Sequence, residues 1–369
     1  MSTELPAKRP VLLEPHLKSY SWGSRTSLPR LLGLPVPSDV PFAELWFGAH
    51  PSGPAFVAGT PLPEWIARDR NAALGPGSAE LRFLVKLLAA ELPLSLQVHP
   101  DAALARARFD DPELRAASLA ADPQPKPELI IALERFEALA GLRPFDDARD
   151  LCARIDVDCG RATDERSFLV RVLSGAQGQV GRAFQAMDRW PNEPCFSRAK
   201  DLHALYPADP AALSPLLLRH HVMSPGEALV IDPGVPHAYL HGTGLEVMES
   251  SDNVIRGGLT SKAVDVGAFA EAVIAGPCMP VGPIELAPNV RCYRGPASAR
   301  FVVEDRDLVE VPTSWSVQGF EVVVVVRGTA RIESTEGFVE LSSGRSAAIP
   351  AACGTITARG DARVFRIHE

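Results

Sequence analysis

Proline and glycine interrupt this chain so often that long helices are not expected over most of its length. The 369 residues include 34 Pro and 28 Gly. Between them lie short apolar runs such as Leu94 to His99, whose alternation of apolar and polar side chains is typical of half-buried strands. Turn dipeptides, Pro225-Gly226 and Pro233-Gly234, flank another such run, Ala228 to Ile231. The sequence therefore predicts a mainly β fold.

One stretch follows a different period. Between about residues 145 and 219, apolar side chains recur at i, i+3 and i+4, as in Asp146 to Ile155 and Glu165 to Leu173, which predicts several short helices. The β pattern resumes at His221. At ~100–200 residues per domain, the length suggests two or three domains. We expect a β domain formed by residues 1–145 and 220–266, a helical insertion at 146–219, and a second β domain at 267–369.

Composition and charge exclude several classes of protein. Hydrophobic residues make up 46% and charged residues 22%, and the formal charge of −8 comes with no long basic run, which disfavours binding to nucleic acid or to anionic membranes. The start lacks the basic-then-apolar order of a secretory signal, and the apolar stretch Leu81 to Val98 is interrupted by Arg82, Lys86 and Glu91. The six cysteines form no CxxC pair, which favours reduced thiols. We expect a cytoplasmic monomer or weak homo-oligomer.

Two segments share a pattern at a constant offset, which indicates that the two β domains are related. The pattern reads G-x5-D-P-G-x2-H over residues 226–237 and G-x5-P-A-A-x2-T over 344–355. Both segments resemble the second motif of the cupin jelly roll, in which a histidine points into the barrel. We therefore expect two cupin-type jelly-roll β-barrels plus a small α-helical domain. Only the first copy has the histidine, which is His237. The second copy has Thr355 at the corresponding position, so the C-terminal barrel is expected to hold no metal.

Four side chains could hold a metal ion in the first β domain. Gln97 and His99 are separated by one residue on a strand-like segment, so they project from the same face. Glu128 begins another strand-like run, and His237 is expected to face into the barrel. Two imidazoles, one carboxylate and one neutral amide would leave a divalent ion with a formal charge of about +1, so it stays a Lewis acid. Taken singly, these residues also fit structural roles, and His50 is expected to be a turn residue.

Six motifs resemble the type I mannose-6-phosphate isomerases, in the order seen in that family. The resemblance covers about residues 18 to 266 and is only loose in the last third of the chain. The motifs are Tyr20-Ser21-Trp22-Gly23, Glu44-Leu45-Trp46-Phe47-Gly48-Ala49-His50-Pro51-Ser52-Gly53-Pro54, Leu94-Ser95-Leu96-Gln97-Val98-His99-Pro100-Asp101, Lys126-Pro127-Glu128-Leu129, Pro236-His237-Ala238-Tyr239-Leu240 and Ser251-Asp252-Asn253-Val254-Ile255-Arg256-Gly257-Gly258-Leu259-Thr260.

The resemblance implies a zinc-dependent enzyme that interconverts mannose 6-phosphate and fructose 6-phosphate through an enediolate. It implies one zinc ion per chain, with ligands at four positions: Gln97, His99, Glu128 and His237. It also implies that Arg256 lies near the reacting carbons, where its fixed charge suits an enediolate.

One departure from the family bears on proton transfer. A histidine that some members carry two residues before the proline of the Lys-Pro-Glu motif is Pro125 here. Proton transfer must then rely on another group, such as Lys126 with a depressed pKa, a metal-linked water, or Glu128. Asp252 is expected either to help open the sugar ring or to orient Arg256.

The sugar phosphate needs cations and hydroxyls. The candidate substrate-binding residues are Ser95, Lys86, Lys262, Tyr239 and Trp22. The two lysines could equally be ordinary surface residues. Two alternatives to the isomerase remain: an iron-dependent cupin oxygenase, which Gln97 fits poorly, and a non-catalytic sugar-binding protein with two cupin barrels.

Overall fold

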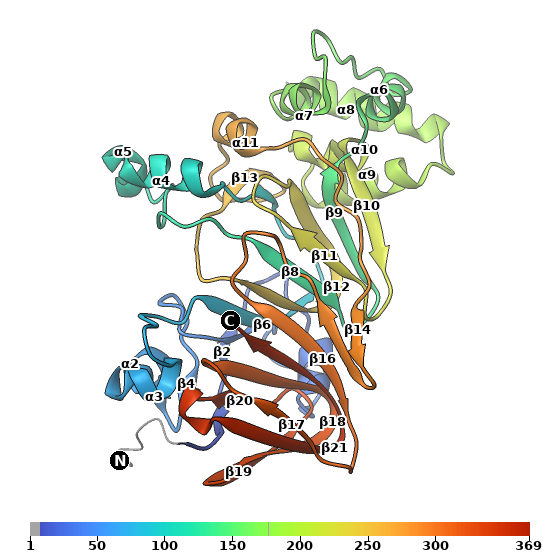
Figure 1. Cartoon of the computed structure of the whole chain (residues 1–369). Coiled ribbons are helices and arrows are strands. Elements are labelled where there is room, and N and C mark those ends of the chain that lie inside the picture. The colour runs from blue at the N-terminus through green and yellow to red at the C-terminus, as the bar shows by residue number, and fades with distance from the viewer. Residues whose placement is uncertain (1–7, 176) are drawn as a thin grey trace.

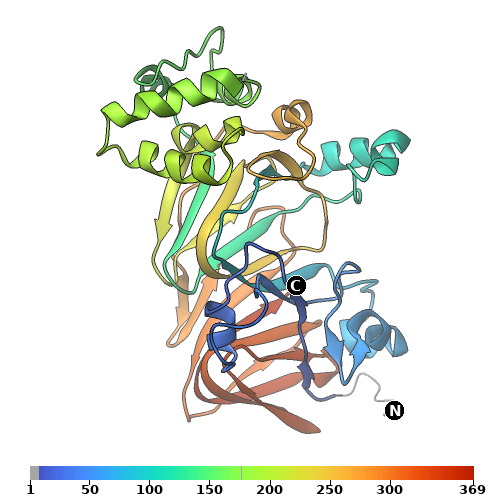
Figure 2. The same ribbon diagram turned by 180° about the vertical axis from the view of Figure 1, so that it is seen from behind.

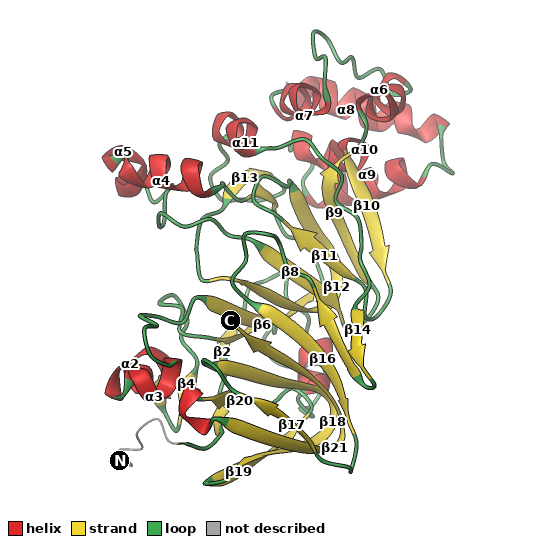
Figure 3. Cartoon of the chain, viewed as in Figure 1, coloured by secondary structure: helices red, strands yellow, loops and turns green. Residues whose placement is uncertain are grey.

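Two large β-sheets and a set of short helices form the protein, as the computed structural model of residues 8–175 and 177–369 shows (Figure 1, Figure 3). The prediction of a mainly β fold is confirmed. Each sheet encloses an apolar core of its own, and a further core lies between the two sheets. No helix among these residues is long and apolar enough to cross a bilayer.

The first sheet has ten strands and is organised around one long central strand, β12. Its strands are β2 (His16–Lys18), β3 (Glu44–Phe47), β6 (Phe83–Ala90), β7 (Leu96–Val98), β8 (Glu128–Ala132), β9 (Phe136–Leu142), β10 (Leu218–Met223), β11 (Ala228–Ile231), β12 (His237–Glu249) and β13 (Ile255–Gly258). Strand β12 pairs along its length with β6, β7, β8 and β9, so it brings segments that are distant in sequence to one place.

The second sheet has nine strands and comes mostly from the last third of the chain. Its strands are β1 (Val11–Leu13), β14 (Ile284–Ala287), β15 (Val290–Tyr293), β16 (Val302–Leu308), β17 (Thr313–Ser316), β18 (Glu321–Ser334), β19 (Gly337–Ser342), β20 (Ser346–Ile349) and β21 (Thr355–His368). Strand β1 pairs with β20, so the N-terminal segment closes the edge of the C-terminal sheet. A separate hairpin joins β4 (Phe56–Val57) to β5 (Thr60–Pro61).

Helices gather at the end of the ten-stranded sheet that lies away from the nine-stranded one (Figure 2). Between β9 and β10 the helices are α6 (Phe145–Ala153), α7 (Glu165–Leu173), α8 (Gln177–Ala186), α9 (Pro194–Leu205) and α10 (Ser214–Leu217), with a 3-10 turn at Met187–Arg189 and another at Pro210–Leu213. They occupy the stretch where the i, i+3, i+4 spacing predicts helices. Their apolar sides pack on β7, β9, β10 and β12.

Aspartates begin most of the helices elsewhere in the chain. These helices are α1 (Ser27–Leu31), α2 (Leu62–Arg68), α3 (Arg70–Leu74), α4 (Ala102–Asp110), α5 (Pro112–Ala116) and α11 (Val266–Ala272), and a 3-10 turn covers Ala351–Cys353. The carboxylates of Asp69, Asp101, Asp111 and Asp265 accept hydrogen bonds from the first backbone N–H groups, which would otherwise lack partners.

The repeated sequence pattern marks equivalent places in the two sheets, with one correction. Gly226 and Gly344 have φ of +92° and +78° and each precedes a short strand, β11 or β20. The long strand that follows starts at His237 or at Thr355. The expectation that Thr355 takes the inward position is wrong, because Thr355 is exposed and the buried core residue is Ile356. The turn in the second copy contains a 3-10 helix, which shifts the facing residue by one.

Strand register extends the comparison to charged residues. Glu128 pairs with Ile231, and Glu321 pairs with the corresponding Ile349. Across the central strands, Lys86 pairs with Glu246 in one sheet and Glu304 pairs with Arg366 in the other, so the signs of charge are exchanged.

Because the charges are exchanged, the second sheet has an arginine, Arg366, next to its buried carboxylate, Glu321. Glu321, only 1% exposed, accepts hydrogen bonds from the Arg366 guanidinium and from the Trp315 indole, which donates over 2.9 Å. In the second sheet, therefore, the Arg366 side chain supplies the positive charge beside Glu321, which is the residue equivalent to Glu128.

Candidate active site

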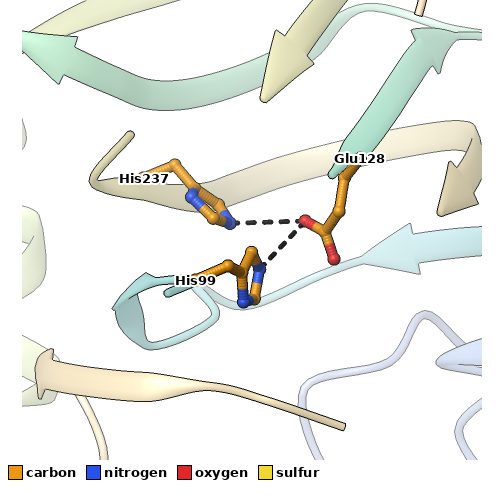
Figure 4. Close-up of side chains that lie close together, drawn as sticks. All are labelled: His99, Glu128 and His237. Atoms are coloured by element: carbon orange, nitrogen blue, oxygen red, sulfur yellow. Dashed lines mark ion pairs between the residues drawn. The ribbon is translucent and has the colours of Figure 1, made fainter. Parts of the chain in front are cut away.

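Three buried side chains converge from three elements of the ten-stranded sheet. His99 lies just after β7, Glu128 begins β8 and His237 begins β12 (Figure 4). Glu128 Oε2 lies 3.2 Å from His99 Nε2 and 3.5 Å from His237 Nε2. One donor atom from each residue lies within 4.8 Å of the other two, and none of the three side chains is more than 1% exposed. The expectation that these residues meet is confirmed.

Backbone carbonyls orient both imidazoles toward the centre of this cluster. His99 Nδ1 donates a hydrogen bond to Asn253 O over 2.7 Å, and His237 Nδ1 donates one to Val235 O over 2.9 Å. The second ring nitrogen of each histidine is then free to offer a lone pair, an arrangement typical of metal-binding histidines. Among residues 8–175 and 177–369, His99 Nε2 and Glu128 Oε2 are buried and find no hydrogen-bond partner. Buried nitrogen and oxygen atoms whose lone pairs have no hydrogen-bond partner are suited to bind a divalent cation.

Gln97 lies beside this cluster, on β7. Its side-chain Nε2 is 3.1 Å from His237 Nε2, and in register Gln97 pairs with both His237 and Arg256. Rotation of the side-chain amide by 180° exchanges its nitrogen and oxygen and so places Oε1 at the same point. Gln97 is therefore within reach of an ion held by the cluster.

Burial and neighbouring charges set the protonation of the cluster. Burial lowers the pKa of His99 to about 4, so its imidazole is neutral near pH 7 and able to bind a cation. Burial opposes the charge of Glu128, yet the Lys126 ammonium holds the pKa of that carboxyl well below its usual value. Lys126 Nζ lies 2.9 Å from Glu128 Oε1. The cluster thus combines the neutral imidazole of His99 with an ionised carboxylate.

Asn253 ties together the segments that carry the ligands, a role that the sequence did not reveal. Its backbone oxygen holds His99, while its side-chain Nδ2 donates to Asp122 O and Gln124 O over 2.6 and 2.8 Å. Ser251 Oγ also donates to the Asp122 carboxylate. These bonds fasten the segment before β13 to the loop that leads to Glu128.

A cavity of about 640 Å³ opens beside the cluster and brings the predicted residues together. Its lining includes the expected residues Trp22, Lys86, Ser95, Gln97, Lys126, Glu128, Tyr239, Asp252, Arg256 and Lys262. It also includes residues to which the sequence reasoning gave no role, among them Tyr20, Glu44, Trp46 and Glu246. Glu44 and Trp46 could have been suspected, because they belong to one of the six motifs.

The lysines of the cavity differ sharply in environment. Lys86 is 6% exposed, and its Nζ lies 2.9 Å from Glu246 Oε2 and 3.7 Å from Glu44 Oε1. The alternative of a surface lysine is therefore wrong for Lys86, and the 7% exposure of Lys126 excludes a solvated surface charge there too. Lys262 is exposed and lies 5.8 Å from the centre of the Tyr20 ring.

Arg256 and Asp252 both line the cavity but form no ion pair with each other. Arg256 is half-buried and burial lowers its pKa, yet a guanidinium remains charged at neutral pH. Asp252 instead contacts Ser52 and His50. Direct orientation of Arg256 by Asp252, one of the two expected roles, lacks support in this geometry.

Aromatic side chains shape the wall of the cavity. Tyr239 is 1% exposed and its hydroxyl has no hydrogen-bond partner in the described part of the chain. Burial and the nearby Glu246 carboxylate raise the pKa of Tyr239 well above its usual value, so the hydroxyl keeps its proton. Trp22 is half-buried and stacks on Tyr20 with ring centres 5.7 Å apart.

The family profile and two curated relatives that match this chain carry the name of one enzyme. A family profile described as "Phosphomannose isomerase type I, catalytic domain" matches residues 11–145. The chain is 31% identical to a mannose-6-phosphate isomerase of Escherichia coli (strain K12), covering 96% of this chain and 98% of that one, and 28% identical to that of Rattus norvegicus, covering 89% and 90%.

Solved structures are similar over nearly the whole chain. A zinc-bound mannose 6-phosphate isomerase matches with a TM-score of 0.88 and 29% identity, covering 98% of this chain and 100% of that one. The apo form of mannose 6-phosphate isomerase from Salmonella typhimurium matches with a TM-score of 0.89 and 30% identity, covering 98% and 99%.

Proposed function

The chain belongs to the type I phosphomannose isomerase family, and from this premise we propose that it interconverts mannose 6-phosphate and fructose 6-phosphate with one zinc ion per chain. One observation carries the conclusion: a relative of that name shares 31% identity over 96% of this chain. The buried cluster of His99, Glu128 and His237 supplies the independent chemical support.

The zinc ligands are proposed to be His99, Glu128, His237 and the amide oxygen of Gln97. Unpartnered atoms at His99 and Glu128, and two imidazoles already oriented by backbone carbonyls, support this set. When bound, zinc would supply a Lewis acid that attracts the oxygen atoms of the sugar. Because only one of the four ligands is a carboxylate, the ion keeps a formal charge of about +1, which suits that role.

Arg256 is proposed to stabilise the enediolate. Isomerisation moves a proton between C1 and C2 and places negative charge on the oxygen atoms, so a fixed cation in the cavity lowers the barrier. Arg256 has no carboxylate within 4 Å in residues 8–175 and 177–369, which leaves its charge available to the substrate. It cannot serve as the base, because the guanidinium does not lose its proton.

Lys126 is the proposed proton-transfer group. Pro125 removes the imidazole that some family members carry, whereas Lys126 lies in the cavity wall with its Nζ 2.9 Å from Glu128. This contact holds Lys126 beside the metal ligands. In the proposed step its neutral amine takes the proton from one carbon, which breaks that C–H bond, and the resulting ammonium returns the proton to the other carbon. Asp252, held from the opposite side by His50, is proposed as a second proton acceptor.

Ser95 and Lys262 are proposed to bind the phosphate, with Trp22 and Tyr239 against the sugar. Lys86 was an equal candidate, but its ammonium already faces the Glu246 carboxylate. Lys262 has no carboxylate within 4 Å in the described segments, so its charge is free for a phosphate oxygen.

The finer architecture is proposed to follow the sequence pattern. Each sheet is a cupin-type jelly-roll β-barrel: residues 1–145 and 220–266 form the catalytic domain, 146–219 a small α-helical domain, and 267–369 a C-terminal barrel without metal. Register supports this assignment, because the positions equivalent to Gln97 and His237 hold Trp315 and Ile356. We further propose a cytoplasmic monomer or weak homo-oligomer that binds neither nucleic acid nor membranes.

A single assay separates the isomerase from its alternatives. Purified protein is given mannose 6-phosphate, and fructose 6-phosphate is measured before chelation, after chelation and after zinc is restored. The isomerase loses activity on chelation and regains it with zinc. Dioxygen consumption without isomerisation would indicate an oxygenase, and binding without turnover would indicate a non-catalytic sugar-binding protein; the family relationship disfavours both.

A further inference from the structure

A turn after β3 contacts two residues that line the cavity, Trp46 and Asp252. His50 lies in this turn, is 3% exposed, and packs its ring edge-on against Trp46 with ring centres 5.2 Å apart. Trp46 lines the cavity, and its indole donates to Glu44 Oε2 over 2.8 Å. His50 is thus a rigidly packed residue beside the cavity and outside the metal cluster.

Hydrogen bonds within the turn fix the tautomer of His50. The backbone N–H of Ser52 donates to His50 Nδ1 over 3.2 Å, so Nδ1 is the acceptor. Burial lowers the pKa of His50, which favours the neutral ring. The remaining ring proton must then be on Nε2.

Two polar side chains of this turn lie beside one carboxylate, that of Asp252. His50 Nε2 lies 3.5 Å from Asp252 Oδ1, and Ser52 Oγ donates to Asp252 Oδ2 over 2.9 Å. The backbone N–H of Asp252 donates to Asp122 Oδ2 over 2.9 Å, which fixes the main chain as well. Ser52 therefore donates to one oxygen of this half-exposed carboxylate, and the His50 ring lies close to the other.

Asp252 differs from the other carboxylates that line the cavity. Glu44 and Glu246 face Lys86, and Glu128 faces Lys126. Within residues 8–175 and 177–369, Asp252 forms no ion pair with a lysine or arginine. Its titratable neighbours are the His50 ring and the Asp122 carboxylate, which accepts from the backbone N–H of Asp252. Asp252 is therefore the one of these four cavity carboxylates that no lysine ammonium faces within the described residues.

We propose that His50 and Ser52 are positioning residues that hold the Asp252 carboxylate at the cavity rim as the acceptor of a substrate hydroxyl proton. In that step the hydroxyl O–H bond breaks and an O–H bond forms on Asp252. This inference rests on the proposed isomerase function. The buried His50 ring and the Ser52 hydroxyl fix the orientation of Asp252 without placing a lysine or arginine beside it.

Matched substitutions at position 50 test the proposal. His50→Gln keeps an N–H donor near the place of Nε2, whereas His50→Leu keeps the bulk and removes the donor. Turnover of mannose 6-phosphate should fall about tenfold or more in His50→Leu, on the scale of small displacements of a reacting group, with KM within about twofold. His50→Gln should recover at least half of the lost kcat.

Asp252→Asn provides the background that separates positioning from a merely structural role. If His50 acts through Asp252, the His50→Leu and His50→Gln proteins should have equal kcat when Asp252→Asn is also present. Wild-type kcat in His50→Leu, or an undiminished loss in the Asp252→Asn background, would overturn the proposal.

A structural readout keeps this proposal distinct from the function on which it rests. Crystal structures should show the Asp252 carboxylate turned away from the rim in His50→Leu and in Ser52→Ala. The carboxylate should stay in place in His50→Gln. An unmoved carboxylate in His50→Leu would overturn the positioning role even in an active enzyme. Absence of isomerase activity in the wild-type protein would refute the proposed function instead.

Discussion

Replacing Lys86 with Met should destabilise the protein strongly. Lys86 Nζ is enclosed by Glu246 Oε2 at 2.9 Å and Glu44 Oε1 at 3.7 Å, and all three side chains are 8% exposed or less. Burial opposes the charge of Lys86, but the two carboxylates raise the pKa of its ammonium above the usual value. Lys86→Met keeps the length of the side chain and leaves two carboxylates buried without their cation.

The expected cost follows from that geometry. Removing one partner of a buried ion pair costs about 3–5 kcal/mol, because an uncompensated charge stays in the interior. Urea unfolding of zinc-loaded protein should show a loss of this size in Lys86→Met. Lys262→Met, at the exposed lysine of the same cavity, is the matched control and should change the free energy of unfolding by less than about 0.5 kcal/mol.

A second substitution checks the cause. Adding Glu246→Gln to Lys86→Met removes one of the stranded charges, so the double variant should be more stable than Lys86→Met alone by about 1 kcal/mol or more. If Lys86→Met unfolds within about 1 kcal/mol of wild type while KM for mannose 6-phosphate rises, the counter-ion reasoning fails and Lys86 is a phosphate ligand after all.

Further predictions concern the reaction and the second sheet. Arg256→Ala should lower kcat by at least ~10²-fold with metal content intact, and near-normal turnover would contradict its role. Lys126→Ala should lower kcat and remove one limb of the pH profile; a raised KM with the profile preserved would mark a phosphate ligand instead. Burial alone would raise the pKa of Glu304, but hydrogen-bond donors lower it to about 2. The ionised carboxylate therefore stabilises the folded protein above pH 4.5, the pKa of an unfolded glutamate, and this contribution is lost as the pH falls toward 2. Glu304→Gln should make the melting temperature less dependent on pH between 4.5 and 2. Arg366→Met should destabilise the protein by about 3–5 kcal/mol, and adding Glu321→Gln should recover part of the loss, because Arg366 supplies the cation for that carboxylate.

Side-chain periodicity was enough to predict the centre of the site. Alternation along β7 placed Gln97 and His99 on one face, and the turn before β12 placed His237 toward the same interior. Both inferences need only local geometry. The mainly β fold follows in the same way from short apolar runs between turns.

The supporting residues could not be predicted because they depend on tertiary contacts. Asn253 acts through its backbone oxygen, a group that every residue carries, and Glu246 meets Lys86 only because β12 pairs with β6. His50 resembles an ordinary turn residue until Asp252 is brought to it. Thr355 was misplaced by one position because a short 3-10 helix in the second copy does not show in the spacing of its residues.

Metal content tests the central claim most directly. Elemental analysis of purified wild-type protein should give about one zinc per chain, and His237→Ala should lose most of it, because the substitution removes one of three converging buried donors. Arg256→Ala, in the same cavity but outside the donor set, should keep the wild-type content. Unchanged zinc in His237→Ala, or an ion in electron density within the C-terminal sheet, would contradict the assignment of the metal centre.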